Sequence, residues 1–317
     1  MGSSESQLIK QGGCKWQAQL SDSTLLFDVS IPGTHNRCAL YGVPILDYGK
    51  CQSKDLPDQY NMGIRYVDIR CRPFENNLTI HHEQIYQNKS FGQVLQETKT
   101  FLNNNPSEFI VMNIQKEYTS EKCTKAPTEI LKSYLENYED MFYNYKSDKK
   151  DNPPVGEIRS KVFIIYSGWG GTGGLSWSLI SRQDEYDVPT IHEIAKKKDL
   201  IRHHFKEYQQ FSTHKKLSIN MCSGVGILCT AITVASATNS VVGEFTQNEN
   251  GLGIVGMDFQ TDEVVWSIIL SNFQLRCNIK HRTTGKYFGN LGEIFQGEPC
   301  GWLNAQPSFH FIHGGNK

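Results

Sequence analysis

The sequence predicts an α/β fold, a (β/α) barrel with a small C-terminal β appendage, on the strength of three observations. Short runs rich in Val, Ile and Phe recur along residues 20–274 without strict polar–apolar alternation, as in strands buried on both faces of a parallel sheet. Segments with helical periodicity separate several of these runs. From about residue 275 the helical pattern is replaced by Gly- and Asn-marked turns between short β-prone pieces.

Seven apolar runs predict strands. They are short and bounded by turn-forming residues, which favours strands over helices. Alternation of strands with helices predicts parallel strands that close into a barrel of roughly seven or eight strands. The runs are "LLFDVSI" (25–31), "IRYVDIR" (64–70), "LTIHH" (78–82), "EFIVMNI" (108–114), "KVFIIY" (161–166), "KLSIN" (216–220) and "GLGIVGMDF" (251–259).

Three segments predict helices between these strands. The clearest is "SFGQVLQETKTFLNNNP", which we expect to end at Asn105-Pro106. The segments 126–142 and 190–208 have similar periodicity. In the first segment one helical stripe carries Phe91, Val94, Leu95, Thr98 and Leu102.

Composition and charge limit the function classes. The 317 residues are 38% apolar and 21% charged, and 32 basic against 33 acidic residues give a net charge of −1. This balance lacks the basic surface of a nucleic-acid-binding protein, so that class is excluded. We expect an N-terminal segment (1–20), a barrel domain (21–274) and a β-rich appendage (275–317).

We predict a cytoplasmic protein that contacts membranes peripherally. The most apolar stretch, residues 225–238, is too short and too rich in Thr and Ser to cross a bilayer. The N-terminus lacks the pattern of a secretory signal, although Gly2 and Ser6 fit a myristoylation pattern. Nine scattered cysteines without a CxxC pair favour a reducing compartment, with a disulfide between Cys277 and Cys300 as an open alternative.

Polar residues gather at the predicted carboxyl ends of the strands, where barrel enzymes carry their chemistry. These polar residues are His35-Asn36, Asp68 with Arg70, His81-His82, Lys116-Glu117 and Asp258. Packing alone does not account for such residues at the ends of five separate strands.

This set suits the cleavage of a phosphodiester. One His removes a proton from an attacking hydroxyl and a second protonates the departing oxygen. An Arg presents a fork of donors to the phosphoryl oxygens, and a carboxylate fixes the tautomer of its His partner.

These motifs resemble a known family. "SIPGTHN", "GIRYVDIR", "LTIHHEQIYQ", "FLNNNPSEFIVMNIQKEY" and "GIVGMDF" are similar to the X-domain of the bacterial-type phosphatidylinositol-specific phospholipases C, in order from about residue 24 to residue 273. The resemblance implies a distorted TIM barrel. It also implies attack of the inositol 2-hydroxyl on phosphorus, which releases diacylglycerol and inositol 1,2-cyclic phosphate.

The resemblance implies a role for each site residue. His35 corresponds to the general base and Asp258 to the residue that orients it. His82 corresponds to the general acid, assisted by Asn36, and Arg70 binds the phosphate. The expected substrate contacts are Asp68, Lys116 and Glu117; Asp68 is alternatively a partner of Arg70 or His35.

Departures from the family pattern concern metal use and the headgroup. Calcium-using relatives have an acidic ligand at the position of Arg70, so we expect no metal cofactor. The calcium-using relatives have Asn after their catalytic His, as this chain has Asn36 after His35, so a calcium-dependent mechanism remains the alternative. Gln115 and Ile165 stand where the family has basic residues, so the contacts to the inositol ring are altered.

Apolar and aromatic side chains are expected around the barrel entrance. A membrane-facing rim is predicted, since Trp and Tyr suit a bilayer interface. Its members are Tyr41, Val43, Ile45, Leu46, Trp169, Trp177, Ile227 and Leu228. The alternative is that these side chains pack on the barrel top. His81 is expected to be structural, because neighbouring residues of a strand face opposite ways.

The sequence thus predicts an enzyme that cleaves phosphatidylinositol or a related phospholipid in a membrane surface. The alternative is a catalytically weak module that binds lipid or inositol phosphate on the same barrel. A glycerophosphodiesterase needs paired metal-binding carboxylates, and Arg70 interrupts that pair in "DIR".

Overall fold

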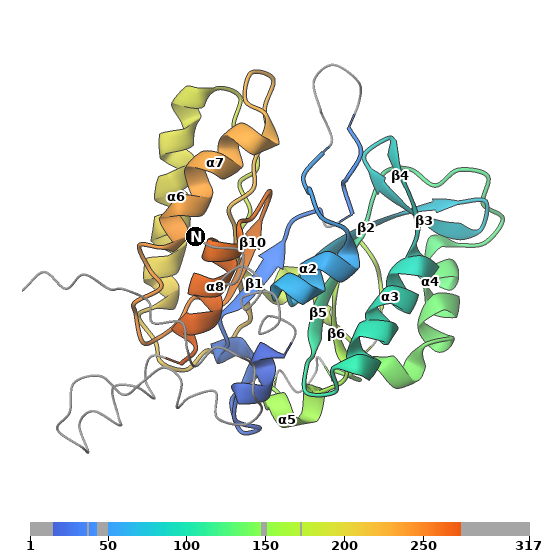
Figure 1. Ribbon diagram of the computed structural model, residues 1–317. Helices are drawn as coiled ribbons and strands as arrows, with labels where there is room; N and C mark the ends of the chain where they lie inside the picture. The colour runs from blue at the N-terminus through green and yellow to red at the C-terminus, as the bar shows by residue number, and fades with distance from the viewer. Residues whose placement is uncertain (1–14, 37, 43–49, 147–150, 172, 274–317) are drawn as a thin grey trace, which may run out of the picture.

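The computed structural model describes residues 15–36, 38–42, 50–146, 151–171 and 173–273, which form a distorted (β/α) barrel (Figure 1). Eight parallel strands pair in the order β7-β6-β5-β2-β1-β10-β9-β8. Among the described residues β7 and β8 do not pair, so the barrel is open between them. These strands are β1 (Ile31–Thr34), β2 (Tyr66–Phe74), β5 (Ile110–Lys116), β6 (Val162–Ser167), β7 (Leu175–Ser176), β8 (Ser181–Gln183), β9 (Ser218–Met221) and β10 (Ile254–Met257).

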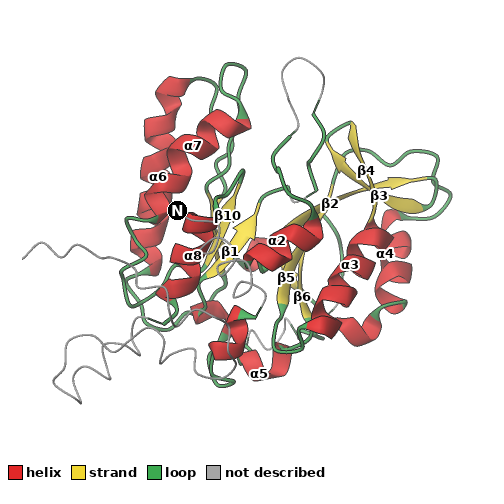
Figure 2. Cartoon of the chain, viewed as in Figure 1, coloured by secondary structure: helices red, strands yellow, loops and turns green. Residues whose placement is uncertain are grey.

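Helices cover the outside of the strands (Figure 2). In the view of Figures 1 and 2, α6, α7 and α8 lie to the left of the strands, α2 lies in front of them, and α3 and α4 lie to the right. An antiparallel hairpin of β3 (Asn77–His82) and β4 (Ile85–Ser90) extends from β2. The helices are α2 (Leu56–Met62), α3 (Phe91–Asn104), α4 (Pro127–Glu136), α5 (Val155–Ile158), α6 (Ile194–Tyr208), α7 (Ala231–Val242) and α8 (Asp262–Ser271).

The predicted helix at residues 90–106 is confirmed. A capping box of Ser90 and Gln93 begins α3, and the helix stops at Asn105, because Pro106 cannot continue it. Every residue of the predicted apolar stripe is buried.

Two predicted boundaries differ from the structure. Residues 25–31 form a short 3-10 turn (Leu26–Asp28), and the strand itself begins only at Ile31. The indole of Trp16, within the expected N-terminal segment, is buried in the barrel core and donates to the Gly63 carbonyl oxygen. The barrel unit therefore begins before residue 21.

Some expectations lie outside the described residues: the C-terminal appendage, the myristoylation pattern and the possible 277–300 disulfide. Within the described residues, all six cysteines are free thiols. No helix in the described ranges combines the length and hydropathy needed to cross a membrane.

Candidate active site

β1 delivers His35 to the carboxyl end of the barrel. This strand lies between β10 and β2, and Gly33 pairs with Tyr66. A Cβ on Gly33 would lie 2.5 Å from the Tyr66 ring, so only glycine allows the two strands to approach this closely. The His35 amide continues the β1–β10 pairing by donating to the Met257 carbonyl oxygen over 3.0 Å.

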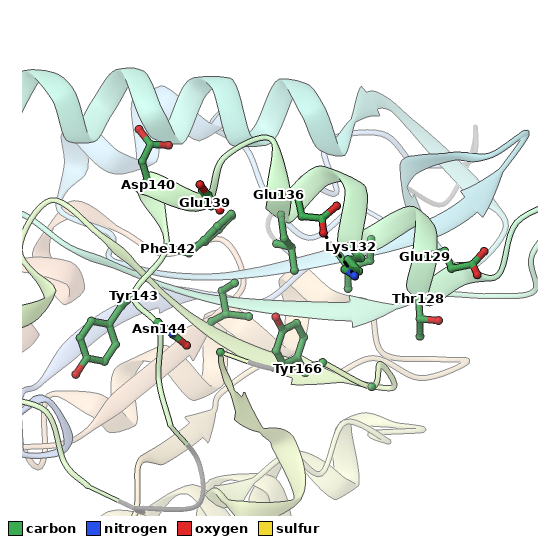
Figure 3. A pocket seen from close by; sticks show the side chains of 16 residues that line it. Thr128, Glu129, Lys132, Glu136, Glu139, Asp140, Phe142, Tyr143, Asn144 and Tyr166 are labelled. Carbon is green, nitrogen blue, oxygen red and sulfur yellow. Dashed lines mark ion pairs between the residues drawn. The ribbon is translucent and has the colours of Figure 1, made fainter.

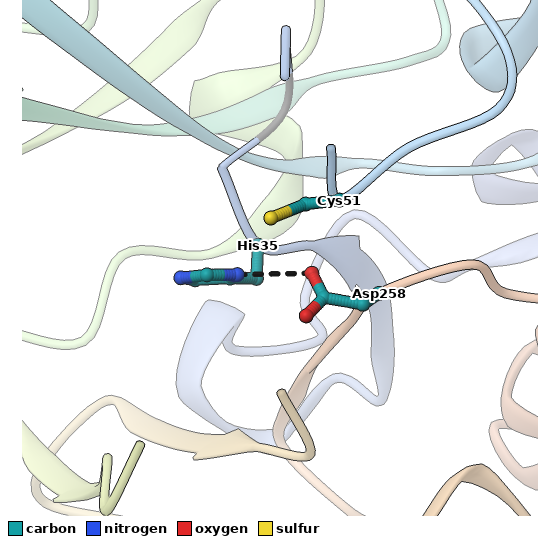
Figure 4. A group of neighbouring side chains, drawn as sticks. All are labelled: His35, Cys51 and Asp258. Carbon is teal, nitrogen blue, oxygen red and sulfur yellow. Dashed lines mark hydrogen bonds and ion pairs between the residues drawn. The ribbon is translucent and has the colours of Figure 1, made fainter. Parts of the chain in front are cut away.

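Asp258 follows β10 and meets His35 (Figure 4). Its Oδ1 lies 2.9 Å from His35 Nδ1, and the carboxylate is buried. The Gln52 side-chain amide donates to the carbonyl oxygens of both His35 and Met257. The ends of β1 and β10 are thereby fixed together, which holds the imidazole and the carboxylate in register.

Arg70 determines the tautomer of His35. Arg70 Nη2 lies 2.7 Å from His35 Nε2. A guanidinium has only donors, so Nε2 accepts and Nδ1 carries the proton that is donated to Asp258. The imidazole is therefore neutral, with its basic lone pair directed at the position where Arg70 would hold a phosphate.

Asp68 is the partner of Arg70 rather than a free acceptor. Its Oδ2 receives Arg70 Nε at 3.2 Å and the Asn36 amide at 3.0 Å, and its Oδ1 receives Asn113 Nδ2 at 2.8 Å. Burial alone would raise the pKa of Asp68, but Arg70, His35 and these hydrogen bonds outweigh it and lower the pKa. The carboxylate is thus a charged anchor for the guanidinium.

Glu117 connects Arg70 to the segment that follows His82. Its Oε2 lies 3.7 Å from Arg70 Nη1, and its Oε1 accepts the Glu83 amide at 2.7 Å. Burial raises the pKa of Glu117, against the opposing effect of Arg70. The end of β3, where His82 is half-buried, is therefore tied to the guanidinium.

His81 occupies the structural position predicted for it. Its ring is buried and lies 5.5 Å from the Tyr86 ring in the neighbouring strand β4. Burial lowers the pKa of His81, with Arg72 contributing in the same direction. The neighbouring residues of β3 thus divide into a packed His81 and a more accessible His82.

Lys116 lies on the wrong face for the substrate contact predicted for it. Side chains alternate along β5, so Gln115 shares the face of Asn113, which bonds Asp68, and the exposed Lys116 is on the opposite face. Ile165 of β6 pairs in register with Asn113 and faces the same way. The altered family positions, Gln115 and Ile165, therefore line the inner face.

Asp184 belongs to this site and was not predicted from the sequence. It follows β8 and remains in contact with solvent. Partial burial raises the pKa of Asp184, and the carboxyl also interacts electrostatically with His35, Asp68 and Arg70. Asp184 follows β8, a strand of three residues that is too short for hydrophobic periodicity to reveal, so no sequence signal marked this position.

A buried amine supports the segment around Asp184. Lys197 of α6 donates to Gln183 Oε1 at 3.2 Å and to the Glu185 carbonyl oxygen, the residues on either side of Asp184. Burial lowers the pKa of Lys197 to about 8. Lys197 therefore fixes the Asp184 backbone from behind.

The predicted rim is only partly present. Trp169 is only 9% exposed and packs in the core, against its prediction, whereas Trp177 is half-buried against the core and its membrane contact stays a prediction. Of the predicted rim, Tyr41 (49%), Ile227 (95%) and Leu228 (75%) are exposed, and Val43, Ile45 and Leu46 lie outside the described residues. Burial removes a large apolar ring area from water, and this free-energy gain favours packing of a Trp side chain over its exposure on a loop.

A separate groove lies away from this site. Its volume is about 920 Å³, and it runs between α4 and the outer face of β6 (Figure 3). Tyr166 and Leu135 contribute to its apolar floor, while Glu129, Glu136 and Glu139 line it with charge. None of its lining residues belongs to the His35 site.

Comparisons with known proteins identify relatives of this chain. The family model "Phosphatidylinositol-specific phospholipase C, X domain" matches residues 35–167. A 1-phosphatidylinositol phosphodiesterase of Listeria monocytogenes is 29% identical over 281 residues, 81% of this chain and 84% of that protein. One of Staphylococcus aureus is 32% identical over 179 residues, 51% of this chain and 56% of that protein.

Solved structures match over most of the chain. The phosphatidylinositol-specific phospholipase C from Listeria monocytogenes gives a TM-score of 0.71 at 25% identity, covering 82% of this chain and 98% of that one. A Staphylococcus aureus enzyme, solved in work on the modulation of its membrane binding, gives a TM-score of 0.72 at 26% identity, covering 83% and 99%.

Proposed function

The chain belongs to the family of phosphatidylinositol-specific phospholipases C of the bacterial type, and from this premise we propose that it cleaves phosphatidylinositol into diacylglycerol and inositol 1,2-cyclic phosphate. The hydrogen-bonded chain Asp258–His35–Arg70 carries this proposal. It places a neutral imidazole lone pair beside a guanidinium, which are the base and the phosphate ligand that the reaction requires.

The reaction proceeds by two proton transfers. Arg70 turns its donors from His35 to the phosphate, and His35 Nε2 accepts the proton of the inositol 2-hydroxyl. The bond between this oxygen and phosphorus forms as the bond from phosphorus to the glycerol oxygen breaks, and His82 protonates the departing oxygen. Asp258 stabilises the imidazolium that forms at His35.

We propose that the reaction needs no metal cofactor. Arg70 supplies the positive charge at the phosphate, and Asp68 and Glu117 raise the pKa of Arg70 by more than burial lowers it. Asp68 and Glu117 each direct an oxygen at Arg70, so to bind calcium with these oxygens they would have to give up those contacts. Calcium dependence is the alternative that the experiment below distinguishes.

The headgroup sits against an inner face in which one side is apolar. Ile165 stands on this face at a position where the family has a basic residue, so that positive charge is absent. Asp184 and Glu117 offer carboxylates to the ring hydroxyls. We propose an inositol headgroup that is held mainly by these acceptors. A glycosylated inositol lipid is compatible with the same contacts.

Contact with the membrane is assigned to the apex formed by Ile227 and Leu228 together with Tyr41. Each of these three side chains is exposed, and exposed apolar groups on loops favour a lipid interface over water. No net positive charge is needed for this contact, which agrees with the net charge of −1. The cytoplasmic location stays a prediction.

Product analysis on phosphatidylinositol vesicles tests the proposal. The wild type is incubated with a chelator and with added calcium, beside His35→Ala. Cyclic inositol phosphate formed in chelator and lost in the variant supports the metal-free enzyme. Product only with calcium transfers the reaction to a metal mechanism. Vesicle binding without product under either condition indicates the lipid-binding module instead.

A further inference from the structure

A third side chain, Cys51, approaches the His35–Asp258 pair from the segment before α2 (Figure 4). One ring nitrogen of His35, the Cys51 sulfur and a carboxylate oxygen of Asp258 all lie within 4.8 Å of one another. Cys51 and Asp258 are buried, and His35 is half-buried. The proposed reaction gives Cys51 no role.

Asp258 also has coordination capacity that the described chain does not use. Its Oδ2 is buried and has no hydrogen-bond partner among the described residues. Buried carboxylate oxygens are normally satisfied, because an unpaired one costs free energy. The Asp258 carboxylate therefore retains lone pairs for a further partner, and a metal ion is a partner that the neighbouring thiol and imidazole would also bind.

We propose that His35, Cys51 and Asp258 form a binding site for a thiophilic divalent cation such as Zn²⁺, and that the bound ion blocks the reaction. A nitrogen, a sulfur and a carboxylate oxygen are a zinc-type ligand set, whereas Ca²⁺ and Mg²⁺ prefer oxygen ligands throughout. Three protein ligands leave the fourth tetrahedral position to water.

The geometry needs only small adjustments. His35 Nδ1 and Asp258 Oδ1 are 2.9 Å apart, whereas two ligands bonded at about 2.0–2.1 Å in a tetrahedron are separated by roughly 3.3 Å. The pair opens by a few tenths of an ångström, and the sulfur closes toward it. Both movements are within the reach of side-chain rotation.

Inhibition follows from the position of the ring proton. On coordination the Cys51 thiol releases its proton to solvent, and the His35 proton moves from Nδ1 to Nε2. Nε2 then has no lone pair for a substrate hydroxyl or for Arg70, whose guanidinium keeps its contacts with Asp68 and Glu117. Metal binding stands independently of the proposed function, and only its effect on activity rests on that function.

Cobalt provides a direct measurement of the site. Metal-free protein is titrated with CoCl₂, and we expect a thiolate-to-cobalt charge-transfer band in the near ultraviolet that is absent in Cys51→Ser. Zn²⁺ affinity, measured by competition with a chromophoric chelator, should fall at least about 100-fold in Cys51→Ser, since loss of an outer-shell partner alone costs 10–100-fold. Cys222→Ser is the matched control, because Cys222 is also buried within the electrostatic reach of Asp258.

Activity measurements separate the two proposals. Zn²⁺ should inhibit phosphatidylinositol cleavage by the wild type and Cys222→Ser, with reversal by chelator, and should inhibit Cys51→Ser far less. The proposal is overturned if the wild type shows no thiolate band, or if Cys51→Ser retains wild-type Zn²⁺ affinity. A band in a wild-type protein that cleaves no phosphatidylinositol supports the site and removes the proposed function.

Discussion

Arg70 Nη2 lies 2.7 Å from His35 Nε2, so the atom that must accept the substrate proton is already hydrogen bonded to the group that must bind the phosphate. The arrangement keeps the imidazole neutral and in the tautomer with its proton on Nδ1. Binding of the phosphate to Arg70 frees the lone pair of His35 at the moment when the inositol hydroxyl arrives. Phosphate binding and base activation are therefore coupled through one guanidinium.

Arg70→Lys tests this coupling. A lysine keeps the charge but lacks the planar fork that contacts Asp68, Glu117 and the phosphate together, so kcat should fall about 10²–10³-fold. Arg72→Lys is the control, because Arg72 pairs with Glu121 away from the site. The rate of cyclic product formation on a soluble inositol phosphodiester measures both. Near-normal kcat in Arg70→Lys would contradict a bidentate role.

His35 and His82 are expected to act in different halves of the reaction. His35→Ala and His82→Ala should each reduce kcat/KM by about 10²–10⁴-fold on phosphatidylinositol. A phenolic leaving group needs little protonation, so a phenolic inositol phosphodiester should restore much of the activity of His82→Ala and none of His35→Ala. His81→Gln should retain kcat. Equal losses of His82→Ala on both substrates would remove its role as general acid.

Asp184 is expected to bind headgroup hydroxyls as a carboxylate. Asp184→Asn should raise KM about 10–100-fold with a smaller effect on kcat, since a hydrogen bond to a charged group contributes roughly 1.5–3 kcal/mol. The pKa of Asp184 is raised, so its contribution to kcat/KM should be lost as pH falls through this raised value. The pH profile of Asp184→Asn should lack that acid limb. An unchanged limb would assign it to another group, Glu117 being the nearest alternative.

Residue patterns that repeat over many positions were predictable. Apolar residues occur where side chains are buried, so hydrophobic periodicity gave the position of α3 and of five strands. These strands are β2, β5, β6, β9 and β10. β7 and β8 contain two and three residues and carry no detectable period. Residues 25–31 have the apolar content of a strand, but tertiary contacts turn them into a 3-10 segment.

The sequence predicted which residues lie at the strand ends, but it did not predict on which face of a strand each side chain lies. His35, Arg70 and Asp258 come together as expected, because parallel strands bring their carboxyl ends to one edge. The inward face of β5 depends on the pleat, so Gln115 rather than the charged Lys116 lines the site. Asp68 forms an ion pair with Arg70, which was one of the two alternatives that the sequence left open.

The apex of Ile227 and Leu228 is expected to bind lipid. The double variant Ile227→Ser/Leu228→Ser should weaken binding to phosphatidylinositol vesicles by at least about 10-fold, because burial of one such side chain contributes roughly 1.5–3 kcal/mol. Activity on a soluble substrate should be unchanged. Trp169→Phe is the control, since this ring is buried and should not contact a bilayer. Equal losses on vesicles and soluble substrate would indicate a folding defect instead.

Lys197 should contribute a pH-dependent cost to folding. Its pKa is lowered from 10.5 to about 8 by burial, so between these values the unfolded chain holds a proton that the folded chain has released. Unfolding then takes up a proton, and the contribution of Lys197 to stability rises as pH increases from 8 to 10.5, by up to about 3 kcal/mol. Lys197→Met has no proton to exchange. Urea denaturation of both proteins at pH 7.5 and pH 10 should therefore show the wild type gaining stability relative to the variant at the higher pH. A difference between the two proteins that does not change with pH would mean that Lys197 remains charged in the folded state, held by Gln183 and the Glu185 carbonyl oxygen more strongly than burial opposes it.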